Sequence, residues 1–209
     1  MADLTLPYFV AAPSEPNGRG VILCHEGLGL TMQILRFAER LAGEGYTVVA
    51  PDCFFRTGGP KAYGQWDDIN AITPDQRVAD LGTAAAVLRR LGATSIGVTG
   101  FCLGGGFAYS GAKHAEALGI SASVPFYGGM IVDELGDLQC PTLILYGDQD
   151  EHIPFSDVEK IVARHGDAVH VYPGLGHAFM RDDDPDSYDE ATAADAWARL
   201  LAFFDEHLG

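Results

Sequence analysis

The 209-residue sequence is poor in basic side chains, with 13 lysines and arginines against 29 aspartates and glutamates. The resulting formal charge of −16 disfavours binding to nucleic acids and anionic membranes, because both are negatively charged. The sequence also lacks an apolar run long enough to cross a bilayer. Its first residues lack the basic and apolar regions of a secretory signal peptide. We therefore expect a cytoplasmic protein that binds neither nucleic acid nor membrane.

Cysteine is scarce as well, with four residues and no pair spaced as Cys-x-x-Cys. This spacing argues against a zinc ribbon or a thioredoxin-type redox motif, and nothing else in the sequence indicates a metal or an organic cofactor. Cys24, Cys53 and Cys140 lie in or beside apolar runs and are predicted to be small buried hydrophobes. Cys102 differs from them because it lies in a glycine-rich turn.

A chain of this length with 47% hydrophobic residues is expected to form a single domain over residues 1–209, with a core that needs no disulfide or metal. Apolar β-branched runs alternate with helix-period segments, which is typical of a mainly parallel, doubly wound α/β sheet flanked by helices. The predicted strands are residues 5–10, 21–25, 47–51, 95–100, 121–127, 142–146 and 169–172. The predicted helices are residues 32–43, 74–91, 103–114, 155–165 and 188–207. The irregular segment 54–73 is too short for an independent lid domain.

A reactive turn is predicted between the fourth strand and the helix that follows it. Residues 100–104 read Gly-x-Cys-x-Gly directly after an apolar run, which is the pattern of a nucleophile elbow with a thiol in place of the usual serine. Side chains at Gly100 and Gly104 would collide with the backbone there, and the N–H groups of the following helix favour a thiolate at Cys102. The alternative is a buried structural cysteine in a glycine-rich turn.

The residues that would activate Cys102 follow two later strands, in the chain order of an α/β-hydrolase: nucleophile, acid, base. Asp150 comes just after the predicted strand 142–146, and His177 lies in a glycine-rich loop after the strand 169–172. We therefore expect Asp150 to orient His177, and His177 to act as the base for Cys102. Asp148 is the rival acid, although it could instead cap the turn, and His152 is the rival base.

The loop after an early central strand contains a second candidate feature. In hydrolases of this type the loop supplies one oxyanion-binding N–H, and the residue after the nucleophile supplies the other. We assign these donors to the backbone N–H groups of Gly27 and Leu103, and the loss of one such donor commonly costs about 3 kcal/mol. Glu26 precedes Gly27 at the strand end. This position favours a role for Glu26 in the site over the alternative of a solvated carboxylate on the surface.

The sequence resembles the dienelactone hydrolase family over nearly its whole length. The matching segments are His25-Glu26-Gly27, Ala50-Pro51-Asp52, Gly100-Phe101-Cys102-Leu103-Gly104-Gly105, Gly147-Asp148-Gln149-Asp150 and Gly176-His177-Ala178-Phe179. The resemblance implies an α/β-hydrolase fold without a large lid and a triad of Cys102, Asp150 and His177. It also implies that Glu26 holds the resting thiol until substrate displaces it, which would limit oxidation of the sulfur.

The resemblance further implies hydrolysis of an enol-lactone ester bond whose substrate carboxylate is bound by two arginines. Arg181 matches one of these arginines, and its alternative role is a salt bridge to its acidic neighbours 182–184. No arginine stands at the place expected for the other, and Lys61, Arg56 or Arg77 are the substitutes that the sequence leaves open.

Tyr63 and Trp66 resemble the aromatic residues that shape the family's substrate pocket. Together these features predict a cysteine hydrolase of a lactone or small ester, acting as a monomer or weak homo-oligomer. The alternatives are a broader carboxylesterase or thioesterase and, from another class, a non-catalytic binding or redox-sensing protein. The physiological substrate stays open.

Overall fold

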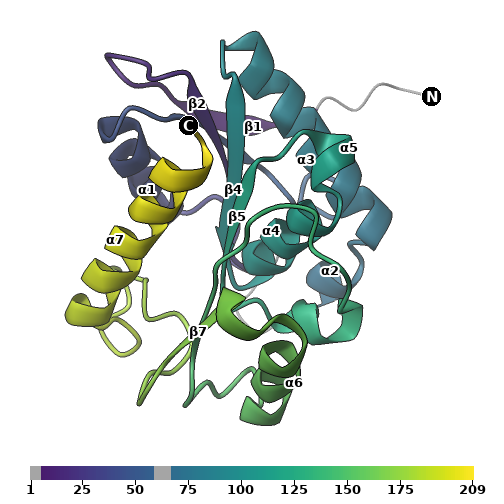
Figure 1. Ribbon diagram of the computed structural model, residues 1–209, viewed down its shortest axis with the longest axis vertical. Helices are drawn as coiled ribbons and strands as arrows, with labels where there is room; N and C mark the ends of the chain where they lie inside the picture. Colours follow the sequence, from purple (N-terminus) through teal and green to yellow (C-terminus); the bar gives the residue numbers. More distant parts are fainter. Residues whose placement is uncertain (1–5, 59–66) are drawn as a thin grey trace.

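The computed structural model describes residues 6–58 and 67–209, and within them a single seven-stranded sheet forms the centre of the molecule (Figure 1). The strand order across the sheet is β1-β3-β2-β4-β5-β6-β7. The first strand pairs antiparallel with β3, and every other pair is parallel. The strands are β1 (Tyr8–Ala11), β2 (Arg19–Cys24), β3 (Thr47–Pro51), β4 (Ser95–Phe101), β5 (Ala122–Phe126), β6 (Ile144–Gly147) and β7 (Val169–Tyr172).

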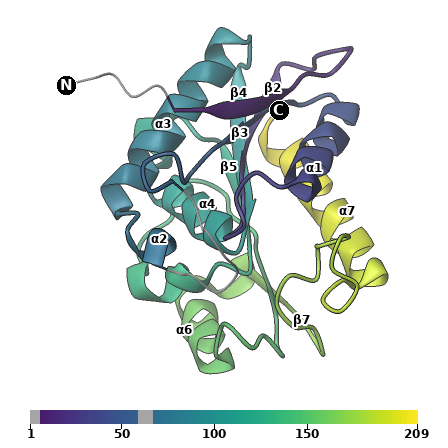
Figure 2. The same ribbon diagram turned by 180° about the vertical axis from the view of Figure 1, so that it is seen from behind.

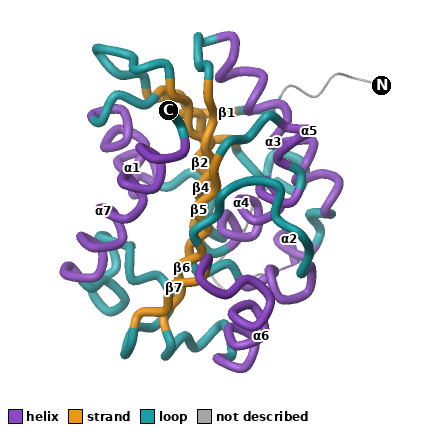
Figure 3. The backbone as a smooth tube through the Cα atoms, in the orientation of Figure 1, coloured by secondary structure: helices purple, strands orange, loops and turns teal. Residues whose placement is uncertain are grey.

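Helices cover both faces of this sheet and give three layers, which Figure 2 shows from behind and Figure 3 shows edge-on as a tube. One face carries α1 and α7, and the other carries α3, α4 and α5, with α6 beside β7 at the far end of the sheet. The helices are α1 (Met32–Gly43), α2 (Asp67–Asn70), α3 (Pro74–Arg90), α4 (Leu103–Lys113), α5 (Ala115–Leu118), α6 (Phe155–His165) and α7 (Glu190–His207). Two 3-10 segments, Gly129–Glu134 and Gly166–Ala168, complete the described part of the chain.

The central strands are buried on both faces, because each face packs against a helical layer. Side chains of β2 and β4 alternate between two apolar clusters, with Leu23 and Phe101 in the cluster under α1 and α7, and Ile22 and Val98 in the cluster under α3 and α4. This double burial explains the near-continuous apolar character of these strands. The prediction of a mainly parallel α/β sheet flanked by helices is therefore confirmed.

The topological switch point of the sheet lies between β2 and β4, and the site is located there. The chain adds β3 on one side of β2 and β4 on the other, and Cys24 at the end of β2 pairs with Gly100 near the end of β4. In open α/β sheets the loops at such a switch point diverge and leave a crevice at the carboxyl ends of the strands. The loops that carry Glu26 and Cys102 leave the sheet at this crevice.

Element boundaries differ from the predictions by a few residues, and local hydrogen bonds explain several of the differences. Helix α7 begins at Glu190 instead of residue 188, because the Asp189 carboxylate accepts the Thr192 N–H at 2.8 Å and caps the helix. Strand β5 ends at Phe126 instead of residue 127, because Tyr127 has a positive φ of 37°. The segment 54–73 contains the short helix α2, and no separate lid domain occurs among the described residues. No helix in this part of the chain has both the length and the apolar character needed to cross a membrane.

Candidate active site

Cys102 lies at the apex of a sharp turn between β4 and α4. Its backbone has φ 53° and ψ −112°, a conformation that a residue with a side chain rarely adopts. The Cys102 N–H donates to the carbonyl oxygen of Phe126 at 3.1 Å, which holds the strained turn against β5. The turn presents a partly exposed thiol above the carboxyl end of the sheet, where Leu103 begins α4 and leaves its N–H without an acceptor inside the helix.

The glycines around Cys102 are required by close backbone contacts. A Cβ atom on Gly104 would lie closer than 3.0 Å to the carbonyl oxygen of Cys24, and one on Gly100 would lie equally close to the carbonyl oxygen of Gly104. Gly105 has the same restriction against the carbonyl oxygen of Phe126. The predicted collision at Gly100 and Gly104 is therefore confirmed, and the turn can form only with hydrogen at these positions.

The structure places the carboxylate of Asp150 against the imidazole of His177, with Nδ1 and Oδ2 2.7 Å apart. Asp150 follows β6, His177 follows β7, and the carboxylate is buried. Its second oxygen, Oδ1, accepts the N–H groups of His152 and Ile153 at 2.8 and 2.9 Å. Asp148 has another partner, because its Oδ1 accepts the Gly174 N–H at 2.6 Å and links the two loops.

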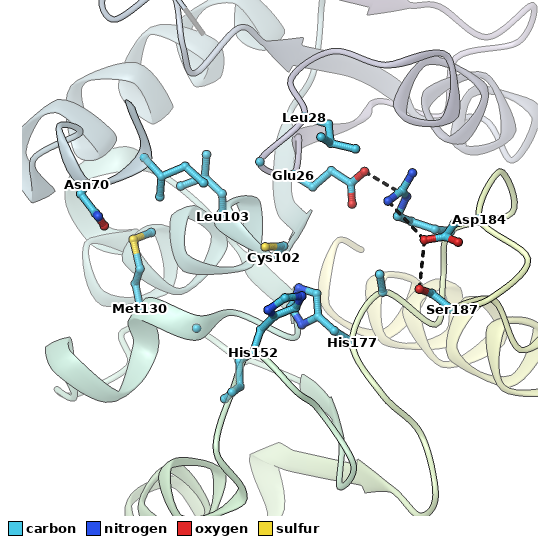
Figure 4. Close-up of a pocket in the computed structure, with 16 residues that line it drawn as sticks. Glu26, Leu28, Asn70, Cys102, Leu103, Met130, His152, His177, Asp184 and Ser187 are labelled. Carbon is cyan, nitrogen blue, oxygen red and sulfur yellow. Dashed lines mark hydrogen bonds and ion pairs between the residues drawn. The ribbon is translucent and has the colours of Figure 1, made fainter. Parts of the chain in front are cut away.

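His177 lies between Asp150 and Cys102. Its Nε2 is buried without a hydrogen-bond partner of standard geometry among the described residues, and Figure 4 shows the Cys102 thiol beside the ring. Burial by itself would lower the pKa of His177, but the hydrogen bond to Asp150 and the adjoining Cys102 sulfur raise it to about 10. The rings of Tyr127 and His152 pack edge-on against His177 at 4.8 and 5.0 Å between centroids and limit its rotation.

His25 fixes the loop that carries the proposed oxyanion donor. Its Nε2 accepts the Cys53 N–H at 2.9 Å, so its Nδ1 carries the proton and donates to the Glu26 carbonyl oxygen at 2.7 Å. The imidazole is therefore neutral, fully buried and bonded at both nitrogens. These bonds fix the peptide group between Glu26 and Gly27. The N–H of that peptide group is the proposed oxyanion donor of Gly27. The sequence marked His25 only as part of a matching segment.

The buried Glu26 and the partly buried Arg181 form an ion pair at the edge of the site, with Nε and Oε1 3.2 Å apart. The guanidinium also lies 3.3 Å from Asp183 and 3.6 Å from Asp184, so it contacts three carboxylates. Asp182, which the sequence grouped with these neighbours, pairs instead with Arg36 at 2.5 Å. Burial raises the pKa of Glu26, and the charge of Arg181 opposes that rise. No hydrogen bond among the described residues joins Glu26 to the Cys102 thiol.

These side chains surround one pocket of about 340 Å³ at the carboxyl end of the sheet (Figure 4). The lining residues are Glu26, Gly27, Leu28, Ile69, Asn70, Cys102, Leu103, Gly129, Met130, His152, Ile153, His177, Ala178, Arg181, Asp184 and Ser187. The pocket thus brings together Cys102, His177 and the expected oxyanion residues Gly27 and Leu103, with Asp150 directly behind His177.

Other residues that the sequence singled out lie elsewhere. Arg56 pairs with Asp80 at 2.6 Å and Arg77 pairs with Glu134, and neither arginine lines the pocket. The remaining candidates, Lys61, Tyr63 and Trp66, lie outside the described residues. Cys24 and Cys53 are buried as predicted, whereas the prediction for Cys140 was wrong, because its side chain is only partly buried.

Sequence reasoning missed several pocket residues that come from segments without a recognisable motif. Asn70 belongs to α2, Met130 to a 3-10 segment after β5, and Ser187 to the loop before α7. Nothing in their local sequence indicates a site, because each reaches the pocket only through the packing of remote elements. The described residues contain no cluster of three or more His, Cys, Asp or Glu side chains arranged to hold a metal ion.

A doubly wound sheet with a nucleophile elbow after a central strand, and an Asp–His pair on later loops, defines an α/β-hydrolase. The model of the "Dienelactone hydrolase family" matches residues 6–208. The chain therefore belongs to the dienelactone hydrolase family, a family of hydrolases of ester and lactone bonds, and the resemblance seen in the sequence is confirmed.

Known relatives agree with this placement. The chain is 35% identical to a Salmonella typhimurium protein named "Putative carboxymethylenebutenolidase", over 98% of this chain and 84% of that protein. A solved structure of a "Putative Dienelactone Hydrolase" from Klebsiella pneumoniae superposes with a TM-score of 0.87 at 32% identity and covers 97% of this chain and 93% of that one. A dienelactone hydrolase-like promiscuous phosphotriesterase from metagenomic libraries has a TM-score of 0.76 at 21% identity and supports the fold alone.

Proposed function

We propose that this protein is a cysteine hydrolase of lactones or small esters, with Cys102 as nucleophile, His177 as base and Asp150 as the residue that orients the base. The observation that carries the proposal is the 2.7 Å hydrogen bond between Asp150 and His177, beside a cysteine held in a strained elbow. Membership of the dienelactone hydrolase family supports the reaction class. The names of its relatives support an enol lactone as one substrate to test.

Acylation begins when His177 Nε2 takes the thiol proton and the Cys102 sulfur attacks the carbonyl carbon of the ester. The carbonyl oxygen becomes an oxyanion, for which the Gly27 and Leu103 N–H groups are the proposed donors. As the tetrahedral intermediate collapses, the carbon–oxygen ester bond breaks and His177 returns the proton to the leaving oxygen. In a lactone this oxygen stays attached to the acyl group, so the ring opens to one acyl-enzyme.

Deacylation uses the same groups in reverse. His177 removes a proton from water, the resulting hydroxide attacks the thioester carbon, and the sulfur leaves and recovers its proton from His177. The products are the carboxylic acid and free Cys102. Asp150 keeps Nδ1 protonated in both halves, so that Nε2 points at the reacting sulfur and accepts its proton.

A broader carboxylesterase or thioesterase is the second candidate, and the apolar part of the pocket favours it. Leu103 and Met130 line the pocket on one side of Cys102 in Figure 4 and would accept an unspecific alkyl or aryl group. A comparison of kcat/KM for lactones, neutral aryl esters and thioesters separates the two. A lactonase prefers the cyclic substrates, whereas a broad esterase shows similar values across the panel.

The decisive experiment measures turnover of this panel by the wild type, Cys102→Ala and Cys102→Ser. We expect Cys102→Ala to lose activity by about 10³-fold or more, because the nucleophile is absent. In the wild type, intact-mass spectrometry after rapid quenching should detect the acyl group on Cys102. Full activity in Cys102→Ala would refute the mechanism. No turnover, combined with sulfenic acid at Cys102 under mild peroxide, would favour a redox-sensing role instead.

A further inference from the structure

The pocket has two ends of different chemistry on opposite sides of Cys102. Figure 4 shows Asn70, Leu103 and Met130 on one side of the sulfur, and Asp184 and Ser187 on the other. The first end is mainly apolar. The second end contains the Glu26–Arg181 ion pair and the carboxylate of Asp184.

Arg181 has its positive charge already compensated by the protein. Its Nε lies 3.2 Å from Glu26 and 3.3 Å from Asp183, and its Nη1 lies 3.6 Å from Asp184. One guanidinium therefore faces three carboxyl groups within ion-pair distance. Protonation of Glu26 would leave two carboxylates against one guanidinium, so this group of four side chains keeps an excess of acidic groups.

Within the described ranges no second arginine or lysine lines the pocket to offset this charge. Arg56 and Arg77 are committed to Asp80 and Glu134 outside it. The imidazoles of His152 and His177 lie beside Cys102 in Figure 4, and Asp184 and Ser187 lie to one side of them. A substrate carboxylate at the acidic end would consequently meet like charges in a partly desolvated site.

The acidic end is also equipped to accept hydrogen bonds. Asp184 is about one-third exposed, and its Oδ2 atom contacts Arg181 and accepts the Ser187 hydroxyl at 3.0 Å. Its Oδ1 atom accepts no hydrogen bond from any residue that the structure describes. A group that donates a hydrogen bond, such as a hydroxyl, an amide N–H or an ammonium, matches this acceptor.

We propose that the acidic end of this pocket, with Asp184 as a specificity-determining residue, selects neutral or cationic lactones and esters that present a hydrogen-bond donor and rejects those that carry a carboxylate there. The proposal rests on the proposed function, because it names the substrate class of the same Cys102 site. It assigns Arg181 to an internal ion-pair network with Glu26, Asp183 and Asp184 and not to binding of a substrate carboxylate.

The test compares two enol lactones that differ in one group, cis-dienelactone with its carboxylate and the corresponding neutral primary amide. We expect kcat/KM for the amide to exceed that for the carboxylate by about 10-fold or more, corresponding to about 1.4 kcal/mol. Asp184→Asn removes one of the repelling charges while keeping the shape of the side chain. It should lower the amide-to-carboxylate ratio by about 3-fold or more, since the repulsion weakens.

Asp182→Asn is the matched control, because Asp182 lies on the same loop, pairs with Arg36 and does not line the pocket. Its ratio should equal that of the wild type. A wild-type preference for the carboxylate, or an equal ratio in Asp184→Asn and Asp182→Asn, would overturn the inference and leave the cysteine mechanism intact. Absence of turnover for both lactones, with no acyl group on Cys102, would instead overturn the proposed function and this inference with it.

Discussion

At the scale of single residues, the site depends on how firmly the carboxylate of Asp150 is held. Two backbone N–H groups and one imidazole nitrogen bond to its two oxygens at 2.7–2.9 Å. In the proposed mechanism, a carboxylate fixed in this way gives His177 one orientation and one tautomer and stabilises the imidazolium that forms when His177 accepts a proton. Asp148, two residues earlier, joins the neighbouring loop through Gly174 instead.

Replacing Asp150 by asparagine should therefore lower kcat by about 10³-fold or more, because an amide no longer favours the reactive tautomer of His177. The measurement is the steady-state hydrolysis of the best ester of the panel. Asp148→Asn is the matched control and should reduce kcat by less than about 5-fold, because its carboxylate only supports a turn. The reverse order of the two effects would identify Asp148 as the acid.

At the scale of elements, the strand–turn–helix unit of β4 and α4 stores strain that only its glycines permit. Cys102 adopts a positive φ, and the backbones around Gly100, Gly104 and Gly105 approach so closely that no Cβ fits. Such strain persists because the sheet and α4 fix both ends of the turn. As a result, the partly exposed Cys102 side chain lies at the start of α4, beyond the end of the sheet.

Gly104→Ala should consequently destabilise the protein by about 2–4 kcal/mol or prevent its folding, because the new methyl group meets the Cys24 carbonyl. Urea unfolding followed by circular dichroism measures this difference. Gly43→Ala, at the end of α1, is the control, since a Cβ there has no heavy atom within 4 Å. It should be neutral or stabilising by up to about 1 kcal/mol. Equal stability of Gly104→Ala and the wild type would contradict the close approach.

At the scale of the whole molecule, a formal charge of −16 surrounds a compact three-layer fold. The surface pairs several basic side chains with carboxylates, including Arg19 with Asp205 and Arg164 with Asp137, but the acidic excess stays uncompensated. Self-repulsion of this excess opposes the folded state, because folding brings the charges closer together.

We therefore expect added salt to stabilise the protein, since screening shortens the range of the repulsion. Raising NaCl from about 0.02 to about 0.3 M at pH 7.5 should increase the free energy of unfolding by about 1 kcal/mol, or Tm by about 2–4 °C. Differential scanning calorimetry checks this at both salt concentrations. Near the isoelectric point of about 4.5 the increase should vanish. A Tm that falls with salt at pH 7.5 would show that the surface ion pairs outweigh the repulsion.

Much of the fold could be predicted from the sequence, because strands and helices follow from local patterns of apolar and β-branched residues. The elbow was predictable for the same reason: its glycines and its cysteine are neighbours in the chain, and the steric conflict that they avoid is local. The proposed positions of Asp150 and His177 followed from counting strands, since each lies just after a strand of the sheet. Boundaries that depend on a cap or a positive φ, as at Asp189 and Tyr127, were displaced by one or two residues.

The hydrogen bonds of His25 and the partners of Arg181 could not be predicted in the same way. His25 bonds to Cys53, 28 residues away, and Arg181, which follows β7, meets Glu26, which follows β2. These contacts depend on the order of the strands in the sheet and on the paths of the loops that follow them, and no local preference encodes either.

The sequence by itself thus determined the family, the α/β sheet and the strained turn around Cys102, because steric and conformational preferences act between near neighbours. The tertiary structure alone decided the charge around the pocket, because an electrostatic field sums over every residue that folding brings close. Arg181 could bind a substrate carboxylate when considered alone in the sequence. In the folded protein Arg181 is one cation among the three carboxyl groups of Glu26, Asp183 and Asp184. We therefore propose a substrate that carries no carboxylate at this end of the pocket.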